Sequence, residues 1–249
     1  MQETEETFLS HLIELRTRLV RVLLVFFVAA APMLYFSAEL YDVLAYPLMR
    51  SLPEGSRMIA TGVITPFLIP MKISIMAGFL LALPLVLYQA WAFVAPGLYS
   101  HEKKLVLPLV VSSTLLFFLG VAFCYFFVFG KVFTFIQSFA PKSVSAMPDI
   151  EAYLSFVLTM FVAFGAAFEV PIVVVVLARM GLVSIEKLKG FRAYFTVLAF
   201  IIAAVLTPPD VVSQLALAIP MVLLYEVGIV AAQVFIKHTQ APAEETPRP

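Results

Sequence analysis

The sequence Phe93-Val-Ala-Pro-Gly-Leu-Tyr-Ser-His-Glu-Lys-Lys104 is a short polar segment between two long apolar runs. It sets one carboxylate, Glu102, beside a histidine and two lysines. A second charged segment, His11-Leu-Ile-Glu-Leu-Arg-Thr-Arg-Leu19, stands directly before the first apolar run. Short basic segments between apolar runs are typical of a protein that crosses a membrane several times. We therefore expect both segments to lie on one side of a membrane and to form a docking surface together.

The composition supports a membrane protein. The chain has 249 residues, of which 62% are hydrophobic and only 13% are charged, whereas soluble domains carry about 25% charged residues. Its formal net charge is zero, so no overall field points to nucleic acid as a partner. The single cysteine, Cys124, lies inside an apolar run, which excludes an internal disulfide and gives no basis for a metal cluster. The chain contains no P-loop, zinc-protease or serine-hydrolase motif, so we expect neither catalysis nor a cofactor.

We predict an all-α integral membrane protein with one six-helix domain over residues 1–239 and a disordered tail over residues 240–249. The spans are expected at about residues 19–36, 70–93, 105–129, 153–178, 194–206 and 211–236, since each is a predominantly apolar run. An amphipathic helix on the membrane surface, Thr7–Leu19, is expected to lead into the first span. Long loops are expected over residues 37–65 and 130–152.

The last two apolar runs differ from the others. Tyr194–Leu206 has 13 residues, which make about 20 Å of helix, less than the roughly 30 Å of a bilayer core. The turn Thr207-Pro-Pro-Asp210 then leads into Val211–Ile236. Either the bilayer thins around this pair, or the two form a re-entrant hairpin. We favour six spans because Lys237 then falls on the same side as the other basic segments.

The distribution of Lys and Arg predicts the orientation. With the N-terminus inside, eleven of the 16 Lys and Arg residues fall on the cytoplasmic side and four fall in the outer loops. Positive charge collects on the cytoplasmic side of membrane proteins, so we expect both termini in the cytoplasm.

Two carboxylates stand inside apolar runs. Glu169 is ten residues before Arg179, which places it roughly 15 Å along the helix from that end, and Glu226 lies at a similar distance from Lys237. An acidic side chain at that depth is costly unless it faces a cavity or a partner. Each glutamate therefore belongs either to a functional polar site in a hollow of the bundle or to a neutral, hydrogen-bonded structural position.

The carboxylates at the membrane edge also have two interpretations. Glu14 is spaced to pair with Arg18 on the same helix, and Glu102 could pair with Lys103 or cap the next helix. Either could instead contact a partner. Asp210, after the two prolines, is in the position of an N-cap for the last helix.

Four segments together resemble the TatC family, the multi-span subunit of the twin-arginine protein translocase, over about residues 10–236. They are His11-Leu-Ile-Glu-Leu-Arg-Thr-Arg-Leu19, Trp91-Ala-Phe-Val-Ala-Pro-Gly-Leu-Tyr-Ser-His-Glu-Lys103, Ala163-Phe-Gly-Ala-Ala-Phe-Glu-Val-Pro171 and Leu206-Thr-Pro-Pro-Asp-Val211. The resemblance implies a cup-shaped bundle in the bacterial cytoplasmic membrane. Its implied function is that of a receptor for signal peptides with consecutive arginines, exporting folded proteins with energy from the proton gradient. The implied partners are TatA-type and TatB-type single-span subunits, other TatC copies and the lipid bilayer, with no nucleic acid.

The resemblance also implies roles for residues at the cytoplasmic edge. Glu14 and Glu102 would engage the arginines of the signal, while Arg16 and Phe93 would shape the same surface. Arginine suits this role because its planar guanidinium pairs with a carboxylate through two hydrogen bonds.

Further residues match positions of interest in the family. Glu169 matches an intramembrane carboxylate thought to face the concave side of the bundle, where partner helices or the apolar part of the signal dock. Thr207 and Gln214 resemble polar contacts for partner helices, and Pro47 and Asp210 match functional positions on the outer side. The chain departs from the family pattern at Gly130, where many relatives have a proline that ends the third span.

A proton-coupled secondary transporter that uses Glu169 and Glu226 is the alternative function. Such transporters usually have two related halves with broken helices in matching positions. The short pair of runs near the C-terminus has no counterpart in the first three spans, which disfavours this alternative.

Overall fold

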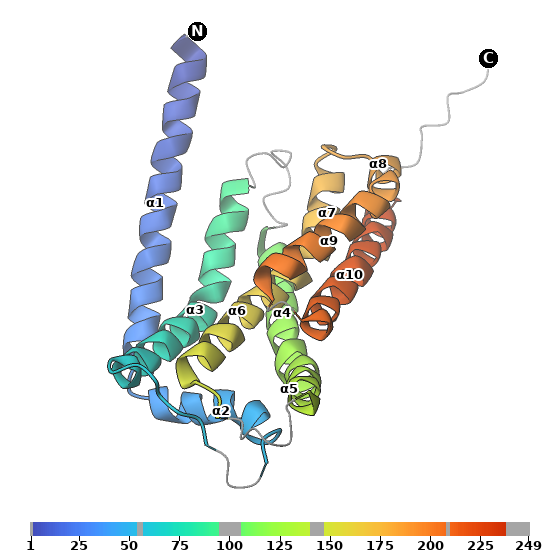
Figure 1. Cartoon of the computed structure of the whole chain (residues 1–249). Helices are drawn as coiled ribbons and strands as arrows, with labels where there is room; N and C mark the ends of the chain where they lie inside the picture. The colour runs from blue at the N-terminus through green and yellow to red at the C-terminus, as the bar shows by residue number, and fades with distance from the viewer. Residues whose placement is uncertain (1, 54–56, 95–105, 140–146, 208–209, 238–249) are drawn as a thin grey trace, which may run out of the picture.

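The computed structural model describes residues 2–53, 57–94, 106–139, 147–207 and 210–237, and these residues form an assembly of helices (Figure 1). The helices are α1 (Gln2–Met33), α2 (Ser37–Met49), α3 (Thr65–Val94), α4 (Val106–Phe123), the π-helical segment η3 (Cys124–Val128), α5 (Phe129–Ser138), α6 (Ile150–Phe168), α7 (Val170–Arg179), α8 (Ile185–Gly190), α9 (Arg192–Leu206) and α10 (Val211–Lys237). Within the described part, one isolated bridge between Ile59 and Asp149 is the only β-type pairing. The prediction of an all-α protein is confirmed.

The N-terminal helix differs from the prediction. Residues 2–33 form one continuous helix, α1, so no bend separates a surface helix at Thr7–Leu19 from the first span. The reason is that the sequence contains no glycine or proline before Pro32 that could interrupt it. After Met33 the chain turns by 87° into α2, which lies across one end of the bundle (Figure 1). The predicted loop over residues 37–65 therefore contains a 13-residue helix.

The third predicted span is longer than expected. The helical path continues from α4 through η3 into α5 and ends at Ser138, so the predicted loop over residues 130–152 begins nine residues too early. Gly130 lies inside α5 and lets the helix continue, because unlike proline it keeps its backbone N–H group. The single π-helical turn Cys124–Val128 absorbs the local change in helical register.

Helix α6 lies at the centre of the packing. It contributes fully buried side chains such as Leu154, Val157 and Phe164 to the main hydrophobic core. Its backbone also approaches α4 closely, since a Cβ atom placed on Gly120 would lie 2.5 Å from the Phe164 carbonyl oxygen. Small residues allow this kind of close backbone approach between helices in membranes. Gly120 thus lets the backbones of α4 and α6 pack in direct contact.

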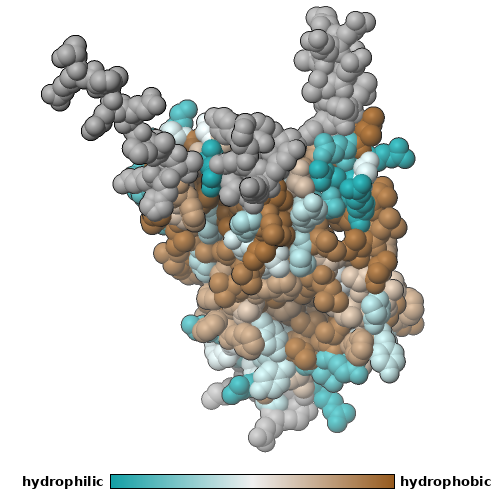
Figure 2. Space-filling view, turned by 180° about the vertical axis from the view of Figure 1, so that it is seen from behind, coloured by the Kyte–Doolittle hydropathy of each residue, from teal (hydrophilic) through white to brown (hydrophobic). Residues whose placement is uncertain are grey.

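In the described part of the chain, four helices are long and apolar enough to cross a membrane, in segments 65–93, 106–138, 150–179 and 211–235. α1 together with α2 passes the same test only as a bent pair, and α9 is a shorter apolar helix of 15 residues. The prediction that helices five and six are both short is confirmed for α9 but wrong for α10, whose 27 residues continue through Pro220 and are long enough to span. Figure 2 shows a continuous apolar band between two ends that carry the hydrophilic side chains. This is the surface of a multi-helix membrane protein; the count of six spans and the cytoplasmic location of the termini stay predictions.

Candidate binding sites at the edge and inside the bundle

Glu14 on α1 binds a guanidinium group. Its Oε1 atom accepts hydrogen bonds from Arg18 Nε at 2.9 Å and from Arg18 Nη2 at 2.6 Å. The pair is half-buried, and the structure confirms the expected pairing within one helix. Arg18 Nη1 also donates to Gln89 Oε1 on α3 at 3.1 Å. One arginine therefore links the Glu14 carboxylate to the neighbouring helix.

This link brings two of the predicted site residues towards each other. Gln89 lies four residues before Phe93 on α3, which is about 6 Å along the helix axis, so Glu14 is held near the end of α3 that carries Phe93. Phe93 is half-buried, and Arg16 is exposed on α1. Glu102 lies outside the described residues, between the end of α3 and the start of α4.

Glu169 lies at a break in the helical path. It ends α6 and precedes α7, because Pro171 cannot donate the backbone hydrogen bond that would continue the helix. Both of its carboxylate oxygens are buried and make no hydrogen bond of good geometry with the described residues. The Ser113 hydroxyl on α4 accepts a 2.9 Å hydrogen bond from the Trp91 indole of α3, and its own hydrogen points to the carboxylate as the one side-chain donor that approaches it among the described residues. One hydroxyl cannot satisfy both carboxylate oxygens, so Glu169 keeps buried acceptor capacity for a further donor.

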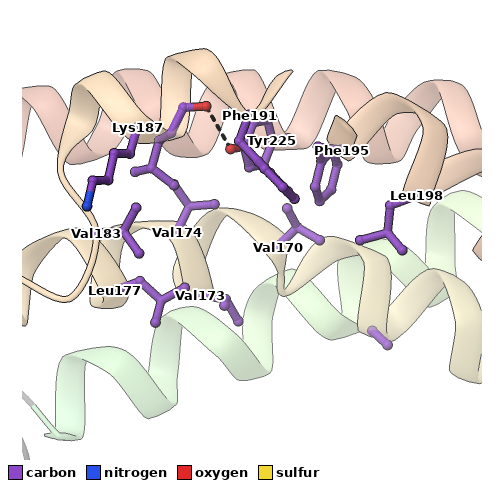
Figure 3. A pocket seen from close by; sticks show the side chains of 12 residues that line it. Val170, Val173, Val174, Leu177, Val183, Lys187, Phe191, Phe195, Leu198 and Tyr225 are labelled. Carbon is purple, nitrogen blue, oxygen red and sulfur yellow. Dashed lines mark hydrogen bonds between the residues drawn. The ribbon is translucent and has the colours of Figure 1, made fainter. Parts of the chain in front are cut away.

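A cavity of about 480 Å³ opens beside this break, and its lining is almost entirely apolar. Figure 3 shows the lining residues: Val170, Val173, Val174 and Leu177 of α7, Val183, Lys187 and Phe191 of the α8 region, Phe195 and Leu198 of α9, and Tyr225 of α10. The Tyr225 hydroxyl donates a 2.9 Å hydrogen bond to the Leu188 carbonyl oxygen, so its polar atom is satisfied within the protein. Lys187 lies at one end of the cavity (Figure 3). The cavity fits an apolar helix or chain rather than a polar solute.

Glu226, the second carboxylate inside an apolar run, has an internal partner. Arg192 at the start of α9 binds it through two contacts, Nε to Oε1 and Nη2 to Oε2, each at 2.7 Å. This bidentate geometry is the strong form of an arginine–carboxylate pair. Glu226 therefore ties α9 to α10, and it does not stand with Glu169 as a second unpaired carboxylate. This counts against the transporter alternative.

Polar side chains at the junction of α9 and α10 form hydrogen bonds within the protein. Asp210 Oδ1 accepts a 2.7 Å hydrogen bond from the Ser213 backbone N–H, as predicted for the N-cap of the last helix. The Thr207 hydroxyl donates to the Ala203 carbonyl at 2.9 Å, and Gln214 Nε2 donates to the Phe200 carbonyl at 3.3 Å. Both residues proposed as partner contacts thus also stabilise the end of the short helix.

Pro47 lies near the end of α2 at the opposite end of the bundle from the described termini. Because proline has no N–H group, it leaves the carbonyl of Val43 without its helical donor. The Tyr125 hydroxyl of η3 donates a 2.7 Å hydrogen bond to that carbonyl. Pro47 thereby contributes to the contact between α2 and η3.

The start of α6 at this same end is fixed by two carboxylates. Asp149 accepts hydrogen bonds from the Thr61 hydroxyl at 2.7 Å and from the Ala152 backbone N–H at 2.9 Å, and these bonds lower its pKa below the ordinary value. Lys72 on α3 pairs with Glu151 at 2.8 Å. These contacts join α3 to α6.

Sequence reasoning missed Gln89, Ser113 and Arg192, which supply the partners just described. Each is a polar residue in or beside an apolar run, and that isolation is the signal that could have singled them out. Their partners lie 22 to 71 residues away in sequence, so spacing alone could not pair them. Among the described residues, no cluster of three His, Cys, Asp or Glu side chains could hold a metal ion.

Comparison with known proteins identifies the family. A family model described as "Sec-independent protein translocase protein (TatC)" matches residues 10–220. The TatC protein of Escherichia coli K12 is 46% identical over 234 residues, which cover 94% of this chain and 91% of that protein. The TatC protein of Halothiobacillus neapolitanus is 51% identical over 96% of this chain, but the match spans only 65% of that longer protein.

Two solved structures of TatC proteins also match this chain. A crystal structure described as the twin arginine translocase receptor TatC has a TM-score of 0.80 and 42% sequence identity, covering 90% of this chain and 98% of that chain. A second structure of the receptor, in the detergent DDM, has a TM-score of 0.81 and 41% identity, covering 89% of this chain and 99% of that chain. The chain therefore belongs to the TatC family of Sec-independent protein translocase proteins.

Proposed function

We propose that this protein is the receptor for twin-arginine signal peptides in a translocase that exports folded proteins across the bacterial cytoplasmic membrane. It binds the signal at its cytoplasmic edge and recruits TatA-type and TatB-type single-span subunits and further copies of itself. The proton gradient supplies the energy, and the protein performs no catalysis and uses no cofactor. The names of its relatives as translocase proteins and as a twin-arginine translocase receptor support this proposal.

The observation that best supports the proposal is that the Glu14 carboxylate already binds the guanidinium of Arg18. A guanidinium group already binds there through Nε and Nη2, so the environment of Glu14 accepts an arginine side chain. A signal arginine that replaced Arg18 would meet the same oxygen acceptor, with Gln89 beside it as a second acceptor.

A pair of consecutive arginines requires a second carboxylate, and we assign this role to Glu102. It belongs to the segment between α3 and α4, whose described flanks lie at the same end of the molecule as the start of α1 (Figure 1). Arg16 and Phe93 complete the surface in this proposal. Two carboxylates favour arginine over lysine because each can form a bidentate pair with a planar guanidinium.

The interior site serves the apolar part of the signal or a partner helix. The cavity beside α7 offers an apolar lining, and Glu169 offers a buried acceptor to a donor carried by the partner. A stripe of exposed apolar residues on α9, namely Val197, Ile201 and Val205, offers a further surface for a single-span helix next to Thr207 and Gln214. Such a stripe at helical spacing is the usual form of a helix-packing face.

Two substitutions in the purified full-length protein separate these roles. Glu102→Ala should weaken binding of a labelled twin-arginine peptide about tenfold or more, since a charge-assisted contact is lost. Glu169→Ala should leave the affinity for a short arginine peptide unchanged and reduce the amount of single-span partner that co-purifies. Unchanged peptide affinity in Glu102→Ala, or lost peptide affinity in Glu169→Ala, would contradict the assignment.

A further inference from the structure

A groove of about 360 Å³ runs between α4, α7 and α10, on a different face of α7 from the cavity of Figure 3. Its walls come from one stripe of each helix. On α10 the stripe is Leu224, Val227 and Ala231, spaced three and four residues apart, and on α7 it includes Val175 and Arg179. Residues at these spacings share one face of a helix, so the groove follows the helix axes.

The length of the groove matches one leaflet of a bilayer. Its lining extends along α7 from Pro171 to Arg179 and along α10 from Leu224 to Phe235, which correspond to about 12 and 16 Å of helix. Half of a typical hydrocarbon core is about 15 Å. The groove thus begins near the middle of the apolar band and ends at the edge where α10 ends.

The charge in the groove lies at this edge. Arg179, in the last turn of α7, is the one charged residue among the described residues that line the groove, and it is half-buried. The other lining residues are apolar except Ser112. A guanidinium carries five N–H donors, so Arg179 can bind a phosphate while it keeps contacts within the protein.

We propose that this groove is a binding site for an anionic phospholipid. One acyl chain lies along the stripes of α4, α7 and α10, and the headgroup phosphate binds Arg179. A basic residue at the edge of a pocket between transmembrane helices is the arrangement that recognises anionic headgroups. The bilayer supplies this ligand at the depth of the groove. The site is independent of the signal-peptide surface, because it does not include Glu14, Phe93 or Glu102.

The cavity of Figure 3 is a weaker candidate for such a lipid. Its cation, Lys187, is exposed at one end, whereas Arg179 is half-buried and forms part of the groove wall. A half-buried guanidinium is the better phosphate ligand because it is weakly hydrated and binds two oxygens at once.

Native mass spectrometry of the full-length protein tests this site. The protein, purified in detergent, is titrated with phosphatidylglycerol and separately with phosphatidylcholine. We expect one tightly retained phosphatidylglycerol, and we expect Arg179→Gln to weaken its retention about fivefold. Lys189→Gln is the matched control, since it removes the same charge from an exposed position on α8 at the same end of the bundle. It should leave retention unchanged.

A second variant tests the groove independently of charge. Ala231→Trp fills the space between α7 and α10, so the folded variant should no longer retain phosphatidylglycerol. If Ala231→Trp does not fold, Val227→Trp takes its place, since Val227 is an exposed residue on the same stripe. Equal effects of Arg179→Gln and Lys189→Gln would overturn the proposal in favour of general surface attraction. Retention that survives in a folded tryptophan variant, or equal retention of the two lipids, would also overturn it. Displacement of the lipid by an apolar single-span peptide without any effect of Arg179→Gln would assign the groove to a helix instead.

Discussion

Arg18 occupies the carboxylate that we assign to the signal peptide, so its removal should strengthen peptide binding. In the free protein, Glu14 Oε1 accepts two hydrogen bonds from Arg18. A signal arginine must displace these bonds or share the carboxylate with them. Arg18→Gln removes the competing charge and the guanidinium that binds Glu14. The variant therefore presents Glu14 unpaired to the ligand.

The size of the effect follows from the exposure of the pair. The side chains are 20% and 37% accessible, so the interaction belongs with half-exposed pairs within a helix, which contribute about 0.5 to 1 kcal/mol. That free energy corresponds to a roughly two- to fivefold gain in affinity. Fluorescence anisotropy with a labelled twin-arginine peptide can resolve a change of this size.

Loss of any positive charge near the site would also favour a cationic peptide, so a control is needed. Arg21→Gln removes the same charge one turn further along α1, at an exposed position. Its effect should be smaller and should vanish at high salt, because screening acts most strongly on exposed charges. If Arg18→Gln binds the peptide no better than Arg21→Gln, or binds it more weakly than the unmodified protein, Arg18 does not compete for Glu14. Weaker binding than in the unmodified protein would instead show that Arg18 positions the Glu14 carboxylate for the peptide.

Two predictions concern the frame that holds these sites. Gly120→Ala should destabilise the protein by about 1 to 3 kcal/mol, because the added Cβ would lie 2.5 Å from the Phe164 carbonyl oxygen and force α4 away from α6. Gly130→Ala is its control: among the described residues, no atom beyond its chain neighbours and the local helix backbone lies within 4 Å of the added Cβ, so thermal unfolding in detergent should show no loss of stability. Asp149→Asn should destabilise the protein at neutral pH and progressively less in acid. The hydrogen bonds from Thr61 and the backbone lower the pKa of this carboxylate below 3.8, so its stabilising contribution is present above that pH and is lost as the pH falls through the lower folded-state pKa. A gap in melting temperature between the two proteins that stays constant from about pH 6 to about pH 3 would show that the charge of Asp149 contributes nothing.

The sequence predicted features that depend on local chemistry. The short helix over residues 194–206, the cap at Asp210 and the pairing of Glu14 with Arg18 all follow from residue type and spacing, and the structure confirms them. Helix ends were harder to place. A proline within α2 suggested a loop, yet the helix continues through Pro47, and the Tyr125 hydroxyl supplies the Val43 carbonyl with the donor that proline lacks.

Contacts between distant residues could not be predicted in this way. Nothing in the spacing of Trp91 and Ser113, or of Arg192 and Glu226, indicates that they meet. These pairs depend on how the helices pack against one another. They also decide the interpretation of the buried carboxylates: Glu226 has an internal partner, while Glu169 keeps two buried oxygens that a ligand or partner helix could satisfy.

The most direct test of the receptor assignment is the affinity of the unmodified protein for two signal peptides that differ only in the consecutive arginines. We expect the twin-arginine peptide to bind and the twin-lysine peptide to bind much more weakly, because lysine keeps the charge but cannot form a bidentate pair with a carboxylate. Equal affinities would mean that only charge is recognised, and would contradict the assignment of paired carboxylates as the arginine site.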